Sequence, residues 1–152
     1  MSRITIDNLS SYLLNGESDT IEFRRSIPKD LDDIKRIISA FANTKGGSII
    51  FGYDELTKVT VGVIENRVRS LQTLCSDPQY KDICAVYTIQ DGDKTVAVLD
   101  VSKAKTGFSV NGNAYIRRGD RMIRKSDHIR SKYLKEFIEE IQYKNRNPQN
   151  LM

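Results

Sequence analysis

Apolar residues recur every three or four positions in several parts of the chain, which is the spacing of one face of an α-helix. The pattern predicts a helix beginning at Asp30, whose first-turn aspartates are favoured by the helix dipole, and a long helix beginning near Asp127. Shorter helices are expected at residues 7–16 and 65–75. The two longest apolar stripes consist of Leu31, Ile34, Ile37, Ile38 and Phe41, and of Ile129, Tyr133, Leu134, Phe137, Ile138 and Ile141.

Other segments have the patterns of β-strands. Residues 20–24 alternate between polar and apolar side chains, as expected for a half-buried strand. Residues 48–53 form an almost unbroken apolar run, which is typical of a strand buried on both faces. We expect this strand at the centre of a sheet, with the helices that begin at Asp30 and near Asp127 packed against it. A further strand is expected at residues 59–63.

Two hairpins follow in the second half of the chain. The first joins residues 85–90 to residues 95–101 through a polar turn. The second joins residues 108–110 to residues 114–116, and its turn contains Asn-Gly, the strongest short-range hairpin signal.

The order of these elements predicts an α+β fold, a mixed β-sheet with packed helices. The length of 152 residues fits a single domain. We expect that domain at residues 1–143, followed by a polar tail at residues 144–152.

Basic residues are concentrated in one stretch of the chain. The whole sequence has a formal net charge of +4, but residues 117–135 contain eight basic and two acidic residues. Such a stretch can present a basic face to phosphate, although a merely solvated surface has the same composition.

Several other classes of protein are disfavoured by the sequence. It contains no apolar run long enough for a membrane span and no signal-peptide pattern at residues 1–14. The spacing of Cys75, Cys84 and the single His128 matches no zinc or redox motif. We expect both cysteines to be buried thiols in a reducing cytoplasm. The glycines at residues 46–47 lack the lysine of a nucleotide-binding P-loop.

Three segments carry longer motifs. ESDTIEFRRS at residues 17–26 is similar to a motif ESxxxEFKxS, with Arg24 where lysine is usual. AFANTKGG at residues 40–47, running into IFGYD at residues 50–54, is similar to a motif AFANTxGG that continues to a glycine and an aspartate. YIRRG at residues 115–119 resembles a strand end YxRxG. Together these motifs resemble the Schlafen AlbA-like domain family, over roughly residues 10–130.

The resemblance implies binding of nucleic acid, DNA or RNA. In the Schlafen branch of the family, two glutamates and an aspartate form a metal-dependent endoribonuclease site that acts on structured RNA such as tRNA. The matching residues here are Glu17, Glu22 and Asp54. In that alternative the three carboxylates would be catalytic and would hold Mg²⁺ or Mn²⁺, whereas binding alone requires no cofactor.

The sequence also departs from Schlafen proteins in two respects. It lacks their cysteine and histidine zinc site, and it has one lobe where they have two. A single lobe can restore a two-lobed groove by two-fold pairing, so we expect a homodimer.

The binding hypothesis assigns the phosphate contacts to basic side chains of the charged stretch and of the motifs. These candidates are Arg25, Lys45, Arg117, Arg118, Arg121, Arg124 and Lys125. An ion pair with Glu22 or Asp54 competes with phosphate binding for one of the two arginines at 117 and 118. Structural roles also compete with ligand contacts at two other places. Asn43 can form a hydrogen bond to the following turn, and the glycines at 46–47 can terminate the preceding helix.

Overall fold

The structure is a computed structural model that describes residues 3–146. Its largest sheet has four strands in the order β1-β2-β6-β5, namely β1 (Ile21–Arg24), β2 (Gly47–Phe51), β6 (Lys94–Val101) and β5 (Cys84–Asp91). β1 and β2 are parallel, and the other neighbours are antiparallel. The fold is therefore α+β with a mixed sheet, as the sequence predicts.

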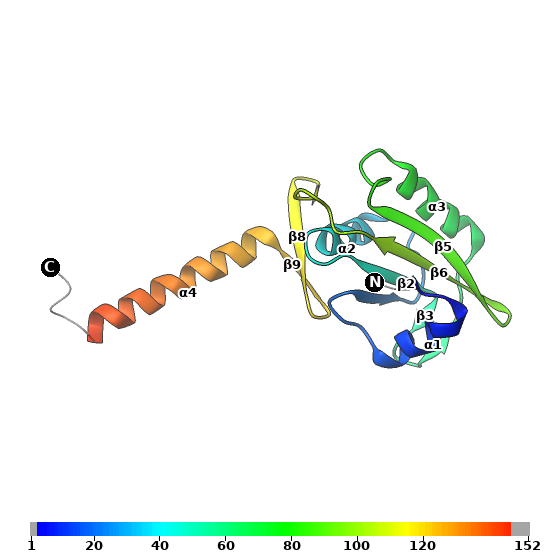
Figure 1. The fold of residues 1–152 in the computed structure, drawn as a ribbon, viewed down its shortest axis with the longest axis horizontal. Helices are drawn as coiled ribbons and strands as arrows, with labels where there is room; N and C mark the ends of the chain where they lie inside the picture. Colours follow the sequence, from blue (N-terminus) through cyan, green and yellow to red (C-terminus); the bar gives the residue numbers. More distant parts are fainter. Residues whose placement is uncertain (1–2, 147–152) are drawn as a thin grey trace.

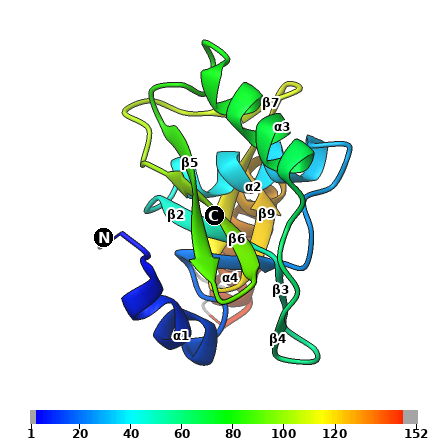
Figure 2. The same ribbon diagram turned by 90° about the vertical axis from the view of Figure 1, so that its right-hand side faces the viewer.

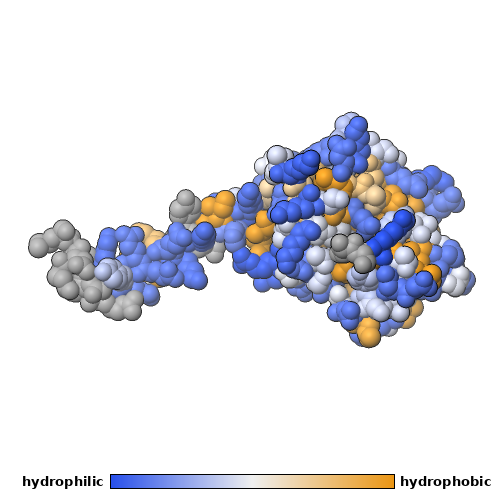
Figure 3. Space-filling view, in the orientation of Figure 1, coloured by the Kyte–Doolittle hydropathy of each residue, from blue (hydrophilic) through white to orange (hydrophobic). Residues whose placement is uncertain are grey.

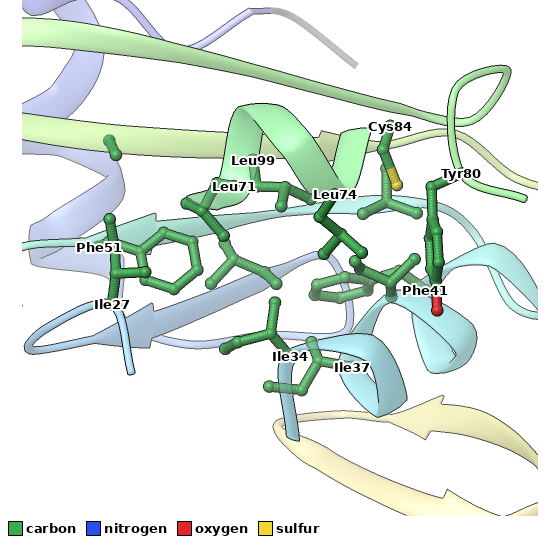
Figure 4. Close-up of a cluster of buried hydrophobic side chains, with 14 of the residues drawn as sticks. Ile27, Ile34, Ile37, Phe41, Phe51, Leu71, Leu74, Tyr80, Cys84 and Leu99 are labelled. Atoms are coloured by element: carbon green, nitrogen blue, oxygen red, sulfur yellow. The ribbon is translucent and has the colours of Figure 1, made fainter. Parts of the chain in front are cut away.

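The two faces of this sheet are covered by different helices (Figures 1 and 2). α2 (Asp32–Ala42) and α3 (Glu65–Ser76) pack on one face, where Phe41, Leu71 and Leu99 meet in the core that Figure 4 shows. α1 (Ile6–Asn15) packs on the other face, where Leu9 lies in a second core with Ile50. All five residues of β2 are buried, which confirms the prediction of a central strand.

Three small differences from the predicted boundaries have local causes. α2 begins at Asp32 rather than Asp30, because the Asp30 carboxylate accepts a hydrogen bond from the Asp32 N–H at 2.9 Å and holds a turn before the helix. β1 is not half-buried, since Glu22 on its polar face is itself buried. The strand expected at residues 59–63 is shorter: β4 (Val59–Thr60) pairs with β3 (Tyr53–Asp54).

A three-stranded sheet lies beside α2 (Figure 1), with the order β7 (Ser109–Val110), β8 (Asn113–Arg118) and β9 (Arg121–Arg124). The predicted Asn-Gly turn joins β7 to β8, and both Asn111 and Gly112 have positive φ, as a tight hairpin turn requires. β9 is an addition to the predicted elements.

The last helix, α4 (Lys125–Arg146), does not pack against the main sheet, and that expectation was wrong. Figure 1 shows it leaving the β8–β9 end of the body and extending away from it. The reason is that α2, α3 and α1 already cover the two faces of the sheet. α4 also continues past residue 143, so the proposed tail begins inside the helix, and residues 147–152 lie outside the described part of the chain. Within residues 3–146, no helix is long and apolar enough to cross a membrane.

Candidate nucleic-acid interface

Arg117 lies inside the protein, not on its surface. Its side chain is 1% exposed, and its Nη1 donates to Glu22 Oε1 at 2.6 Å. Its Nε and Nη2 donate to the carbonyl oxygens of Ser18 and Ile21 at 2.9 to 3.1 Å. The guanidinium carbon also lies 5.0 Å from the centre of the Phe41 ring. Arg117 therefore holds β8 against β1, and each of its three guanidinium nitrogens donates to a group of the protein itself.

Glu22 is the acidic partner in this buried pair. Burial raises the pKa of Glu22, and the nearby Glu17 carboxylate raises it further, while Arg117 opposes both effects. Its second oxygen lies 3.2 Å from Arg24 Nε, although that N–H is not aligned for a hydrogen bond. Arg24 continues the network to Asp33 at 2.8 Å.

Glu17 and Asp54 serve as acceptors for other groups. Glu17 Oε2 accepts a hydrogen bond from the Phe23 N–H at 3.0 Å. Asp54 forms an ion pair with Arg25 Nε at 3.1 Å and accepts hydrogen bonds from two backbone N–H groups of the β3–β4 turn. These backbone hydrogen bonds, together with Arg25, lower the pKa of Asp54.

The three carboxylates do not form a metal site in this arrangement. Glu22 is opposite Ile49 in the β1–β2 register, whereas Asp54 follows the end of β2 and turns toward Arg25. Within residues 3–146, no three acidic, histidine or cysteine side chains are placed to hold a metal ion. The oxygens that Mg²⁺ or Mn²⁺ would require instead accept from the protein's own donors.

Four basic side chains on and next to β8 and β9 face solvent: Arg118, Arg121, Arg124 and Lys125. We call them the basic hairpin. Arg118 and Arg121 are direct cross-strand partners and share the face opposite to that of Arg117. Arg118 Nη2 lies 2.9 Å from His128 Nδ1 on α4. Within the described residues, none of the four is paired with a carboxylate.

Arg25 and Lys45, the other expected phosphate contacts, both have acidic partners. Arg25 pairs with Asp54, and Lys45 Nζ lies 2.6 Å from Asp19. The lysine lowers the pKa of Asp19. A hollow of about 650 Å³ opens beside the Arg25 pair, but its charged lining includes two acidic groups. It is lined by Phe23, Arg25, Tyr53, Asp54, Glu55 and Leu56.

Ser39 in α2 and Asn43 just after its last residue, which the sequence patterns did not identify as a pair, fix the small sheet to the body. The Asn43 side chain accepts from the Phe108 N–H at 2.8 Å and donates to the carbonyl oxygens of Phe108 and Tyr115. The Ser39 hydroxyl donates to the same Phe108 carbonyl and accepts from the Tyr115 N–H. Asn43 thus anchors the strand that carries Arg117 and Arg118, and its role is structural.

The glycines at 46 and 47 are required by close packing. A Cβ on Gly47 would lie 2.6 Å from the Phe41 ring, and one on Gly46 would lie 2.7 Å from the Val101 carbonyl oxygen. Gly46 also has a φ of +76°. These contacts explain the residue choice as the junction between α2 and β2.

The mixed sheet and the helices packed on both of its faces place the chain in the α+β class. The chain belongs to the Schlafen, AlbA_2 family, which matches residues 17–130. No curated protein matches the chain.

Two of the solved structures that share the fold illustrate the similarity. One is the DIP2311 protein from Corynebacterium diphtheriae, with a TM-score of 0.56 and 16% identity; the match covers 78% of this chain but only 29% of that one. The other is the N-terminal domain of a putative ATP-dependent DNA helicase RecG-related protein from Nitrosomonas europaea. Its TM-score is 0.51 at 23% identity, and the match covers 79% of this chain and 92% of that one.

Proposed function

We propose that this chain binds nucleic acid, DNA or RNA, through phosphate contacts of the basic hairpin. The observation that carries the proposal is the contrast between two sets of arginines. Arg117 is buried against Glu22, whereas Arg118, Arg121 and Arg124 project from the same small sheet into solvent with no carboxylate partner among the described residues. Exposed guanidinium groups are suited to bidentate contacts with phosphate.

The contacts should be largely independent of nucleotide sequence. Phosphate contacts position a protein on nucleic acid, and contacts with base edges supply sequence specificity. The basic hairpin offers charges on a short, two-stranded turn rather than a helix that fits the major groove. Family membership and the fold shared with the N-terminal domain of a putative DNA helicase support this class of ligand.

The test measures affinity for a labelled duplex and a structured RNA over a range of salt concentrations. Each lost phosphate contact reduces the slope of log K against log salt by about 0.7 to 0.9. We expect Arg121→Ala with Arg124→Ala to weaken binding and to reduce the slope by about 1.4 to 1.8, on both ligands. Lys81→Ala with Lys94→Ala removes the same charge from exposed positions outside the small sheet and should leave the slope nearly unchanged. Equal effects of the two double variants would refute the proposed interface.

A metal-dependent endoribonuclease remains the second candidate function. One observation favours it: Glu17 and Glu22 are close enough for one carboxylate to raise the pKa of the other. The separate pairing of Asp54 with Arg25 favours binding without cleavage. We therefore place the endoribonuclease second.

The proposal also includes a homodimer and a cytoplasmic location. Two copies of the basic hairpin in one particle would raise the effective affinity for a long nucleic acid without any new contact. The free thiols of Cys75 and Cys84 are consistent with a reducing compartment.

A further inference from the structure

α4 carries an apolar face that the body of the protein does not cover. The side chains of this face are 42% to 59% exposed, and they recur at spacings of three and four residues, so they lie on one side of the helix. They are Leu134, Phe137, Ile138 and Ile141. Figure 3 shows orange, hydrophobic atoms on α4 where it leaves the body.

A helix of this kind requires a packing partner. Most of the stability of helices in proteins comes from the burial of an apolar face rather than from intrinsic propensity. α4 contacts the body at β8 and β9, and Figure 1 shows the helix extending away from this end of the body. The face from Leu134 to Ile141 therefore has to be covered from outside the described residues.

The charges along α4 indicate what covers it. The first half, residues 125–135, carries a net charge of +3, from four basic residues and Asp127. The second half, residues 136–146, carries a net charge of −1, because its three glutamates outnumber Lys144 and Arg146. A parallel neighbour of the same sequence would place like charges at the same level. An antiparallel neighbour of the same sequence places the basic half of each helix beside the acidic half of the other.

The apolar residues fit the same arrangement. With a two-fold axis between Lys135 and Glu136, Leu134 of one helix lies level with Phe137 of the other. Asp127 lies level with Lys144 in the same register. The segment is thus self-complementary in both hydrophobicity and charge, as an isologous interface requires.

We propose that α4 is the dimer interface of this protein, and that its apolar face packs against α4 of a second copy in antiparallel orientation. This inference deepens the homodimer of the proposed function and does not depend on nucleic-acid binding. We choose a second copy as the partner because α4 in antiparallel orientation matches α4 in both charge and hydrophobicity.

The first experiment measures the mass of the full chain by light scattering at micromolar concentration without nucleic acid. We expect twice the monomer mass of 17.3 kDa. Leu134→Glu with Phe137→Glu should give the monomer mass. Lys132→Glu with Glu139→Lys exchanges two charges that lie level with each other in the antiparallel pair, so it keeps their complementarity and should remain dimeric. Far-ultraviolet circular dichroism and thermal melting check that the variants keep the folded body.

A second measurement tests the orientation. A spin label is placed at Ser126→Cys in a Cys75→Ser background, where the remaining Cys84 is buried. In the antiparallel pair the two labelled positions are 19 helical residues apart, which is about 28 Å along the axis. In a parallel pair they would lie within the usual interaxial distance of about 8 to 10 Å.

The outcomes separate the proposals. A wild-type monomer, or a Leu134→Glu with Phe137→Glu variant that stays dimeric, would overturn this interface and leave the nucleic-acid proposal standing. A dimer with the short label distance would overturn the antiparallel arrangement. Loss of nucleic-acid binding by the Arg121 and Arg124 variant, with the dimer mass unchanged, would support both.

Discussion

Arg117 Nη1 and Glu22 Oε1 lie 2.6 Å apart, and this buried ion pair joins residues that are 95 positions apart in the chain. It connects the small sheet to the first strand of the main sheet. The position of the basic hairpin relative to the body therefore depends on a charge pair inside the protein.

Removing either partner of this pair should destabilise the fold. Arg117→Ala leaves Glu22 buried without its cation, and breaking a buried pair costs about 3 to 5 kcal/mol. Arg118→Ala, at an exposed position next in the chain, should change the free energy of unfolding by less than about 0.5 kcal/mol. Urea denaturation measures both. An Arg117→Ala protein with wild-type stability and reduced affinity for nucleic acid would make Arg117 a ligand contact instead.

The pH dependence of stability should reveal the buried glutamate. Because the folded-state pKa of Glu22 is raised above its ordinary value of 4.5, its stabilising contribution is complete below about that pH and is lost as pH rises through the folded pKa. Asp54 and Asp19 have lowered pKa values, so their contributions are lost only as pH falls below 3.8. Carboxyl-carbon NMR titration measures each pKa. Glu17→Gln should lower the pKa of Glu22, since it removes a neighbouring negative charge and keeps an acceptor for the Phe23 N–H. An unchanged Glu22 pKa in that variant would contradict this coupling.

Asn43→Ala should loosen the small sheet while the main core stays intact. The substitution leaves the Phe108 N–H and the Tyr115 carbonyl without their side-chain partner, whereas the Phe108 carbonyl keeps the Ser39 hydroxyl as a donor. Each buried group left unpaired costs about 1 to 3 kcal/mol. Hydrogen exchange should show faster exchange of the Phe108 amide, with the β2 amides little changed. Asn111→Gly provides the control, because its positive φ is the conformation that glycine adopts readily. Uniform loss of protection across both sheets would contradict a local anchor.

Gly47→Ala should be costly because the added methyl group would meet the Phe41 ring at 2.6 Å. Overpacking of this kind costs about 1 to 3 kcal/mol. Gly107→Ala has nothing within 4 Å of the added atom and serves as the matched control. Thermal melting should separate the two variants by several degrees. Equal stability of the two alanine variants would contradict the close contact between Gly47 and the Phe41 ring.

Incubation of the protein with structured RNA and Mn²⁺ decides between binding and cleavage. Binding predicts intact RNA with wild-type protein, with or without a chelator. Metal-dependent catalysis predicts cleavage that Asp54→Asn abolishes. Asp54 is the better test position than Glu22, because Glu22→Gln also disturbs the buried pair with Arg117.

The elements that the sequence predicted well are those with strong local signals. The central strand β2 (Gly47–Phe51) lies in an apolar run that two-sided burial explains. The turn between β7 and β8 is fixed by the positive φ of Asn111 and Gly112. The apolar stripe of α4 was also correctly located. Periodicity cannot say what covers a stripe, however, and α4 leaves the body instead of packing on it.

The site was less predictable because its partners are distant in sequence. The sequence left open whether one of the two arginines forms an ion pair. Arg117 and Arg118 are neighbours with the same side chain, and they differ only in which face of the strand each occupies. Asn43 and Ser39 anchor the small sheet through hydrogen bonds to residues far along the chain. Phe108, for example, is 65 positions from Asn43. β9 is a four-residue strand with charged ends, and its pattern resembles a loop as much as a strand.

The length of α4 has a geometric consequence for two joined copies. The helix has 22 residues, which corresponds to about 33 Å at 1.5 Å per residue. In the antiparallel pair proposed above, the two bodies lie at opposite ends of this rod, and the two basic hairpins beside Lys125 are separated by nearly its full length. That spacing is close to one turn of B-form duplex, about 34 to 36 Å. In such a pair, the two basic hairpins would contact phosphates that lie one helical turn apart on the duplex.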